Sequence, residues 1–206
     1  MRYQNPVVIY TQRIEEPNVT IYYPKLSHMT HREIENKLNH EIYQNVLSLI
    51  EQQQKFQIAG TPEITGHYEI KTNERGILSL TLSNYTYTYP MAHGYTLLQS
   101  LTFDLRTGKQ YTLSDLFKAD SNYVEALSKL VKQQIMTRGI PLLDDFKRIQ
   151  PEQPFYLADK SIVLYFQLYE ISPYYVGFPM FPISVYDILD LSKEDGPLSI
   201  LAADIA

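Results

Sequence analysis

The chain has 206 residues, of which 44% are hydrophobic and 20% charged, and its formal net charge is −5 at pH 7. This length is enough to bury a sizeable core in one large domain or two small ones. The acidic balance argues against non-specific nucleic-acid binding, which depends on a basic surface that displaces counterions, so we expect no nucleic-acid partner. Because cysteine is absent, disulfides, thiolate nucleophiles and cysteine metal ligands are excluded.

Membrane and targeting signals are not apparent in the sequence. No apolar run approaches the roughly 18 to 20 residues that span a bilayer, and the first six residues lack the apolar core of a signal peptide. We therefore expect neither a transmembrane segment nor a leader in the chain as given. Its 18 Tyr residues, accompanied by 8 Phe and no Trp, suit half-exposed sheet positions and binding surfaces alike.

The first predicted elements are two strands, residues 7–10 and 19–23, parted by a polar link over 12–18, with Pro24 ending the second. A capping box at Thr30–Glu33 predicts a helix start, because its hydroxyl and carboxylate each satisfy a free backbone N–H. Apolar residues then recur at spacings of three and four, so one stripe of the helix should pack on a sheet. The stripe comprises Ile34, Leu38, Ile42, Val46 and Leu49, extended by Gln53 and Phe56, and Gly60-Thr61-Pro62 marks the end.

A hairpin follows, with alternating strands over 64–71 and 77–82 and a turn at 73–76. From Tyr85 onward the apolar residues occupy odd positions instead of even ones. This change of parity fits either a β-bulge near Ser83-Asn84 or a strand that passes from one layer to another.

Residues 84–117 form the stretch around which the chain is organised. They predict a Tyr-lined strand, a loop over Pro90–Gly94, a second long strand, a tight turn at 106–109 and a short third strand. A second helix, capped by Asp120 or Ser121, should stop at Gly139-Ile140-Pro141.

The remaining residues predict a loop over 142–154, a strand pair at 155–157 and 161–168, and an aromatic loop over 169–179. Both faces of the strand over 161–168 are apolar, so it should be central. Residues 182–184 lead into 185–189, and the tail from Ser192 should lie on the surface.

This order of elements predicts an α+β fold with two main helices and mostly antiparallel strands. Each half combines one helix with strands, and the halves meet near residue 90. The expected domains are therefore 1–90 and 91–206, which could also form one continuous unit.

Several short motifs in the second half carry a family resemblance. They are Ala92-His93-Gly94, Phe103-Asp104-Leu105, Thr107-Gly108-Lys109, Leu113–Phe117, Phe155-Tyr156-Leu157, Tyr169-Glu170-Ile171, Pro173-Tyr174, Gly177 and Pro182-Ile183. With them the chain resembles the extracytoplasmic region of the lysozyme-sensing anti-sigma-V factor family. Residues 7–90 resemble the domain that precedes it there, and a similar pair stands ahead of some peptidoglycan deacetylases.

The resemblance implies an extracytoplasmic, cell-surface binding domain that recognises a lysozyme-type muramidase or peptidoglycan through loops. The matching loops provide the expected binding residues Ala92, His93, Gly94, Pro173, Tyr174, Tyr175 and Gly177. The transmembrane helix and sigma-binding segment of an anti-sigma factor are not seen, and no deacetylase domain follows. The chain is therefore expected to be a free-standing relative or an excised part of a longer protein.

A hydrolase acting on envelope glycans is the alternative, since glycoside cleavage needs two carboxylates at a set separation. The candidates are Glu69, Asp104, Asp115, Asp159 and Glu170, but nothing in their spacing brings two together. His93 fits a turn in which its ring bonds a backbone carbonyl, and His28 and His31 form only a weak zinc pattern. We expect no catalytic residue, metal or cofactor.

Overall fold

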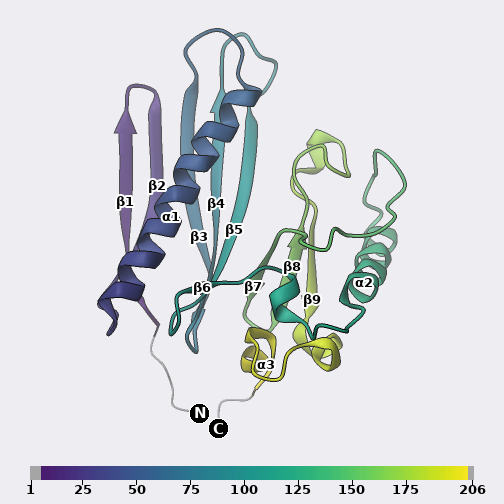
Figure 1. Cartoon of the computed structure of the whole chain (residues 1–206). Coiled ribbons are helices and arrows are strands. Elements are labelled where there is room, and N and C mark those ends of the chain that lie inside the picture. The colour runs from purple at the N-terminus through teal and green to yellow at the C-terminus, as the bar shows by residue number, and fades with distance from the viewer. Residues whose placement is uncertain (1–5, 204–206) are drawn as a thin grey trace. The chain divides into compact units, whose positions relative to one another are not determined.

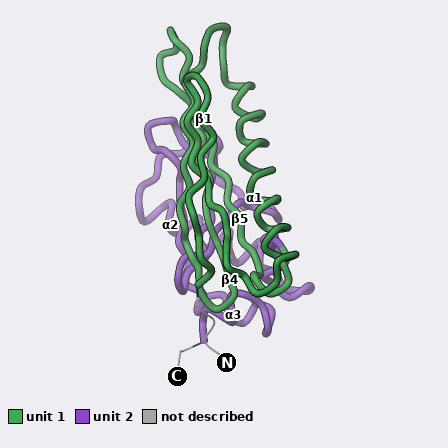
Figure 2. Tube along the Cα trace, turned by 90° about the vertical axis from the view of Figure 1, so that its left-hand side faces the viewer, with its two compact units in different colours: residues 1–109 green, residues 110–206 purple. Residues whose placement is uncertain are grey.

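The computed structural model describes residues 6–203, and the chain forms two compact units, residues 1–109 and 110–206. Figure 2 shows the two units in separate colours. The boundary falls later than the residue 90 expected from sequence, because the strands on either side of that position pair with each other. The α+β class with two main helices is confirmed.

Unit 1 is built on a sheet in the order β1-β2-β3-β4-β5-β6 (Figure 1). The last of these, β6, is a two-residue strand at the unit boundary. The strands are β1 (Val8–Glu16), β2 (Val19–Ser27), β3 (Glu63–Glu74), β4 (Ile77–Tyr87), β5 (Tyr95–Asp104) and β6 (Lys109–Gln110).

One pairing in this sheet is parallel. β2 joins β3 over three residue pairs, from Val19–Ile64 to Ile21–Gly66, with α1 (Arg32–Gln53) as the connection between the two strands. A parallel pair needs such a crossover, whereas β1–β2, β3–β4 and β4–β5 pair antiparallel.

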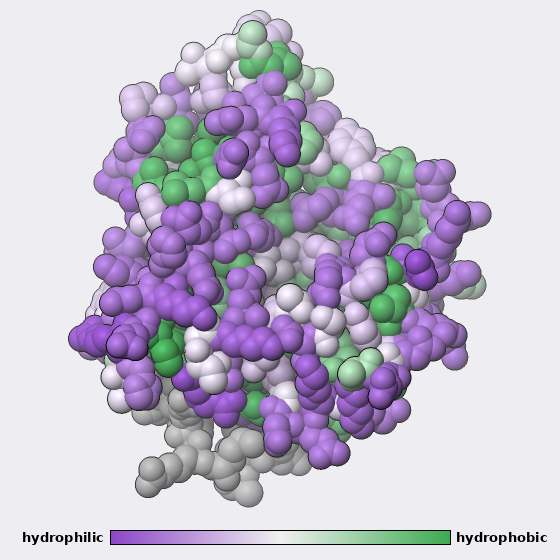
Figure 3. Space-filling view, in the orientation of Figure 1, coloured by the Kyte–Doolittle hydropathy of each residue, from purple (hydrophilic) through white to green (hydrophobic). Residues whose placement is uncertain are grey.

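The helix α1 covers one face of this sheet, as the edge-on view in Figure 2 shows. Its buried residues follow the predicted stripe, and the surface that it turns to solvent is mainly hydrophilic in Figure 3. A short 3-10 turn, η1 (Gln54–Phe56), extends it. The buried side chains that it brings against the sheet are Leu38, Ile42, Val46, Leu49 and Gln53, together with the carboxylate-bearing Glu35.

The first two strands are longer than predicted. β1 runs through most of the expected polar link, and the chain turns only at Pro17-Asn18, where Asn18 has φ 65°. The expected strand end at Pro24 is wrong, because Pro24 lies inside β2 opposite Thr11. Pro is tolerated there since β2 pairs with β3 only up to Ile21, so no ladder bond to β3 is lost.

The predicted capping box is also not the one that the chain uses. α1 begins after His31, whose side chain caps no backbone N–H. Glu35, one turn into the helix, instead accepts the backbone N–H of Met29 at 2.8 Å. The helix start predicted from residues 30–33 is right, but a different carboxylate secures it.

The change of parity at Tyr85 reflects neither of the two expected causes. β4 stays in register with both neighbours through Ser83 and Asn84, and the irregularity lies in β3 between Ile70 and Thr72. Even positions of β4 remain buried past Leu82, but they become polar at Asn84 and Thr86. The apolar residues at odd positions are Tyr85 and Tyr87, which lie on the opposite, less buried face of β4.

Unit 2 contains a three-stranded antiparallel sheet in the order β7-β8-β9. The predicted central strand is confirmed as β8. The helix α2 is tied to β9 by hydrogen bonds from Gln134 to the Pro182 carbonyl and from Arg138 to the Met180 carbonyl, each at 2.7 Å. The elements are η2 (Ser114–Leu116), α2 (Tyr123–Arg138), β7 (Phe155–Ala158), β8 (Ser161–Tyr165), η3 (Tyr174–Val176), β9 (Met180–Ser184), η4 (Val185–Asp187), η5 (Leu189–Leu191) and α3 (Pro197–Ala202).

Two expectations for unit 2 need correction. α2 starts after Asn122 rather than at Asp120 or Ser121, although it ends at Gly139 in the left-handed conformation as predicted. The tail is not surface, because α3 buries Leu198 and Leu201 completely. A helix this short contains too few apolar residues for their spacing to distinguish it from a surface loop.

Candidate binding site

The first expected binding segment is the loop between β4 and β5 in unit 1. The Tyr89–Pro90 peptide bond is cis, and the Met91 N–H donates to the Thr88 carbonyl at 2.9 Å. Tyr89 is 80% exposed, and Ala92 and His93 are exposed as well. The loop therefore presents the ring of Tyr89 and the side chains of Ala92 and His93 to solvent.

Gly94 closes this loop against an aromatic ring and is buried. A Cβ placed at Gly94 would lie 2.2 Å from Cε2 of Tyr85, far inside van der Waals contact. Only glycine allows the backbone to approach the ring this closely, so steric contact with Tyr85 explains the glycine at this position. Gly94 is thus part of the loop's support rather than of its exposed surface.

His93 makes the backbone bond expected for it. Its Nδ1 donates to the Gly94 carbonyl at 2.9 Å, because a carbonyl oxygen can only accept. In the neutral ring this assignment leaves Nε2 as an acceptor.

The second expected segment is the loop between β8 and β9 in unit 2. Here η3 is a single turn closed by two bonds of 3.0 Å, from Val176 N–H to the Pro173 carbonyl and from Gly177 N–H to the Tyr174 carbonyl. Gly177 has φ 76° and ψ −145°, a combination that side chains avoid. The backbone of this segment is therefore fixed at both ends.

Tyrosine rings cover the outside of that turn. Tyr175 is 79% exposed and Tyr169 46% exposed. The rings of Tyr169 and Tyr174 are 5.5 Å apart and tilted by 33°. Ring pairs at this distance stabilise one another, which restricts the surface before any partner arrives.

A neighbouring loop extends this surface within unit 2. The Leu143 N–H donates to the Ile171 carbonyl at 2.9 Å, which joins the segment after α2 to the Tyr-rich loop. Leu143 is 50% exposed, and Asp144 and Asp145 beside it are exposed. Figure 1 shows both loops at the same end of unit 2.

Glu170 lies inside the Tyr-rich loop and has a perturbed carboxyl group. Burial raises its pKa above the ordinary value, while hydrogen bonds from the Gln167 N–H (2.7 Å) and the Gln153 side chain oppose the rise. The carboxylate therefore organises the turn at some electrostatic cost.

The structure brings the predicted binding residues together in two groups. Ala92, His93 and Gly94 share one loop of unit 1, and the residues from Pro173 to Gly177 share one loop of unit 2. Sequence reasoning missed Tyr89 and Leu143 as members of these surfaces. Tyr89 could have been found from its position before Pro90, but Leu143 is located only by its bond to Ile171.

The two units differ in charge. Residues 1–109 contain 10 Lys or Arg and 10 Asp or Glu, whereas residues 110–206 contain 8 and 13. The whole net charge of −5 therefore belongs to unit 2, where the Tyr-rich loop lies.

Over residues 6–203 no three His, Asp or Glu side chains are grouped so that they could hold a metal ion. None of the helices described there has the length and apolar character needed to cross a membrane.

Comparisons with protein-family models match the two units separately. Residues 12–96 match the model described as deacetylase PdaC, and residues 114–186 match DUF3298, a protein family of unknown function. Each model covers less than half of the chain.

One curated relative is the anti-sigma-V factor RsiV of Bacillus subtilis, which is 28% identical over 188 residues. The match covers 82% of this chain but only 63% of that protein. Two solved DUF3298 structures share the fold over 98% of this chain. One, from Bacteroides fragilis, has 14% identity and a TM-score of 0.68 over 98% of its length, and the other, from Pseudomonas aeruginosa, has 16% and 0.71 over 99%.

These matches confirm the resemblance expected from the motifs. The segment before residue 100 and the segment after it each correspond to a different domain model, in the order that the motifs predicted. The chain thus resembles deacetylase PdaC in its first part, DUF3298 proteins in its second part, and the anti-sigma-V factor RsiV over 82% of its length.

Proposed function

We propose that this chain is a non-enzymatic binding module of the bacterial cell envelope that recognises a lysozyme-type muramidase through exposed loops. The loops are residues 90–94 and 173–177, with the extracytoplasmic location that the family resemblance implies. A peptidoglycan fragment is the alternative ligand for the same loops.

The observation that carries the proposal is the display of Tyr175. Tyr175 is 79% exposed on a turn whose backbone is closed by two hydrogen bonds and bounded by Pro173 and Gly177. A rigid, exposed Tyr loses little conformational entropy on docking, and Tyr is enriched among the residues that dominate binding energy. An isolated tyrosine on a flexible loop would offer no such advantage.

Charge supports a basic protein partner over a peptidoglycan fragment, whose carboxylates an acidic surface would repel. Unit 2 has a net charge of −5, and the carboxylates of Asp144 and Asp145 are exposed in the loop bonded to the Tyr-rich loop. Hen egg-white lysozyme is a basic protein, so opposite charges would raise the association rate.

The hydrolase alternative is weaker, although residues 12–96 match a model named for a deacetylase. Glu69 contacts Lys71, and Asp104 is held by Arg106. In unit 2, Asp115 accepts the Thr112 N–H and Glu170 accepts the Gln167 N–H. These carboxylates already stabilise turns or form ion pairs. None of them lines either of two cavities found within residues 6–203.

Calorimetry of the whole chain with hen egg-white lysozyme tests the proposal, with soluble muropeptides titrated in parallel. Tyr175→Ala should weaken lysozyme binding by about 2 kcal/mol, because it removes the most exposed tyrosine of the loop. Met136→Ala is the matched control, since Met136 is 74% exposed on α2 in the same unit. It should leave the affinity unchanged.

The two ligands separate the outcomes. Binding of lysozyme that Tyr175→Ala weakens and Met136→Ala does not supports the proposal. Binding of muropeptides alone would make the envelope glycan the ligand. No heat with either ligand at about 0.1 mM, where micromolar affinity is readily measured, would refute the proposed function.

A further inference from the structure

A cavity of about 460 Å³ lies within unit 1, away from the loops discussed above. Its volume is in the range of small-molecule sites, about 300 to 1,000 Å³. Three segments form its walls: the start of β1, the connection from β2 to α1, and the end of β5. The lining residues are Pro6, Val7, Val8, His28, Met29, Thr30, His31, Leu105 and Arg106.

The wall at the start of β1 is fixed by an amide side chain. Asn73 accepts the Val7 N–H and donates to the Val7 carbonyl, both at 2.9 Å. The two residues are 66 positions apart in the chain, so this pair of bonds secures the wall from the β3–β4 hairpin. The Val7 backbone consequently has a defined position before any ligand binds.

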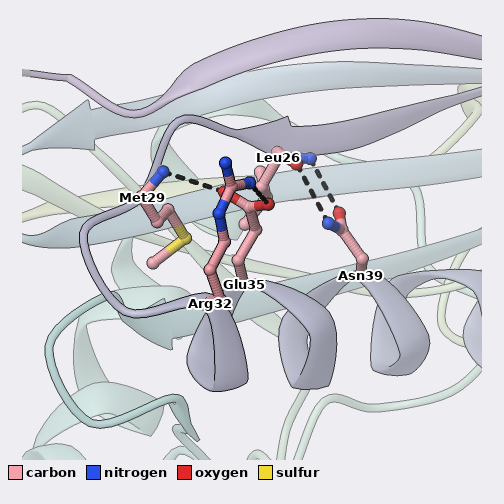
Figure 4. Close-up of polar contacts among 5 residues, drawn as sticks. All are labelled: Leu26, Met29, Arg32, Glu35 and Asn39. Carbon is pink, nitrogen blue, oxygen red and sulfur yellow. Dashed lines mark hydrogen bonds and ion pairs between the residues drawn. The ribbon is translucent and has the colours of Figure 1, made fainter.

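The second wall, between β2 and α1, is held from the helix. Figure 4 shows Glu35 accepting the Met29 N–H (2.8 Å) and pairing with Arg32 (2.7 Å). One helical turn further, Asn39 accepts the Leu26 N–H (2.7 Å) and donates to the Leu26 carbonyl (2.9 Å). Two buried or half-buried polar side chains thus anchor the chain at Leu26 and Met29, on either side of His28 and just before His31.

The third wall carries Arg106. Asp104, which is 5% exposed, accepts the Arg106 backbone N–H at 2.8 Å and two guanidinium N–H groups at 2.9 and 3.1 Å. This bidentate pairing sets the direction of the guanidinium group. All three walls are therefore organised in advance, which reduces the entropy lost when a ligand binds.

The charge of the lining is one-sided. None of its nine residues is Asp or Glu, whereas His28, His31 and Arg106 are all basic. Of the nearest buried carboxylates, Glu35 is paired with Arg32 and Asp104 with Arg106 itself. The Asp104–Arg106 pair is neutral as a whole, so the basic character of the lining comes mainly from His28 and His31. Over residues 6–203 no hydrogen bond engages the ring of His28 or His31, and the ring of His28 has Tyr10 beside it at 6.2 Å.

We propose that this cavity binds a small monocarboxylate with an apolar body. The carboxylate is held by His28, His31 and Arg106, and the apolar body packs against Val8, Met29 and Leu105. A carboxylate fits because imidazole and guanidinium groups donate charge-assisted hydrogen bonds to it, and the apolar lining favours an acid that carries a hydrocarbon group over a bare inorganic anion. Both a free acid and the C-terminus of a peptide have this chemistry.

Titration of the ¹⁵N-labelled whole chain with N-acetyl-leucine, followed by two-dimensional NMR, tests the cavity. We expect shifts of the amide signals of residues 28–31 and 105–106. N-acetyl-leucinamide has the same apolar body without the charge. Its affinity for the cavity should be lower by about tenfold or more. An N-acetylated dipeptide in a parallel titration distinguishes a peptide end from a free acid.

The test variant is His28→Asn combined with His31→Asn. Asn accepts the left-handed conformation of His28, φ 61°, and is a good residue before a helix, so the fold should persist. The variant should bind N-acetyl-leucine about tenfold more weakly. His40→Asn, at an exposed position of α1 outside the lining, should bind like the wild type.

Three results would overturn the assignment. They are no shifts at residues 28–31 and 105–106 up to about 20 mM acid, equal binding of the acid and its amide, and wild-type affinity in a folded double variant. No residue of the loops 90–94 and 173–177 lines the cavity, so none of these results depends on lysozyme binding by the loops.

Discussion

The strands β1 to β5 of unit 1 are nine to twelve residues long, whereas β7, β8 and β9 of unit 2 have four or five. Unit 1 gains its core from one 22-residue helix laid on a long sheet. Unit 2 uses short strands, a 16-residue helix and several single turns. More of its chain therefore lies in connections, and connections are where recognition residues commonly stand.

The two units also place their carboxylates differently. In unit 1, Glu35 and Asp104 are buried and paired with arginines, so they fix backbone and leave a basic cavity between the walls. In unit 2, Asp144, Asp145 and Glu170 stay near the surface around a tyrosine-rich loop. Similar acidic residues thus help to build a pocket in one unit and an exposed face in the other.

The largest expected effect tests whether each unit has its own core. Phe181 is fully buried in unit 2, with Phe166 edge-on at 5.7 Å and Arg138 over its ring. Phe181→Ala should cost about 3 to 5 kcal/mol of stability, because a large cavity replaces the ring. Hydrogen exchange should speed up across residues 110–203 and much less across residues 6–109. Equal loss of protection in both ranges would contradict the separation of the cores.

Sequence patterns predicted the regular elements well, because their causes are local. The helical stripe at Leu38, Ile42 and Val46 and the left-handed stop at Gly139 follow from spacing and from a single residue type. The parallel pairing of β2 with β3 could not be read in this way, because it depends on where α1 returns the chain.

The candidate sites were less predictable than the fold. The motifs located the loops at His93 and Tyr175, but exposure and backbone bonds decided which of their residues face solvent. Sequence patterns do not predict the basic cavity, because Val7 bonds to Asn73, and His31 and Arg106 come to line one cavity, only after the sheet has formed. The spacing of His28 and His31 by itself indicates only a weak metal pattern.

The next largest effect compares the glycines that close the two binding loops. Gly94→Ala should cost about 2 to 3 kcal/mol, because its Cβ would overlap the Tyr85 ring. Gly177→Ala meets no atom within 4 Å and should cost about 1 to 2 kcal/mol, through backbone strain at φ 76°. Thermal unfolding measures both. If Tyr85→Ala fails to relieve part of the Gly94→Ala cost, the steric explanation is wrong.

Glu35→Gln tests the buried carboxylate that secures the cavity wall, and it should cost about 1 to 2 kcal/mol at pH 7. The Met29 N–H and then Arg32 hold the pKa of Glu35 below its ordinary value despite burial. Its stabilising effect is thus present above the unfolded pKa, about 4.3, and is lost as the pH falls through the lower folded value. The free energy of unfolding of the wild type should therefore fall more steeply between pH 7 and pH 3 than that of the variant. Parallel curves for variant and wild type would exclude the carboxylate as the cause.

The smallest effect has the opposite sign and concerns Glu170 in unit 2. Burial raises the pKa of Glu170, so its ionised form is less favourable in the folded chain than in the unfolded chain. The resulting loss of stability appears as the pH rises from the unfolded pKa, about 4.3, through the raised folded value, and persists above it. Glu170→Gln keeps an oxygen that accepts the Gln167 N–H and should raise the melting temperature slightly at pH 7, with no gain below pH 4. A lower melting temperature at pH 7 would mean that the charge supports the Tyr-rich loop, as the charge of Glu35 supports the cavity wall, and the contrast between the units would fail at this residue.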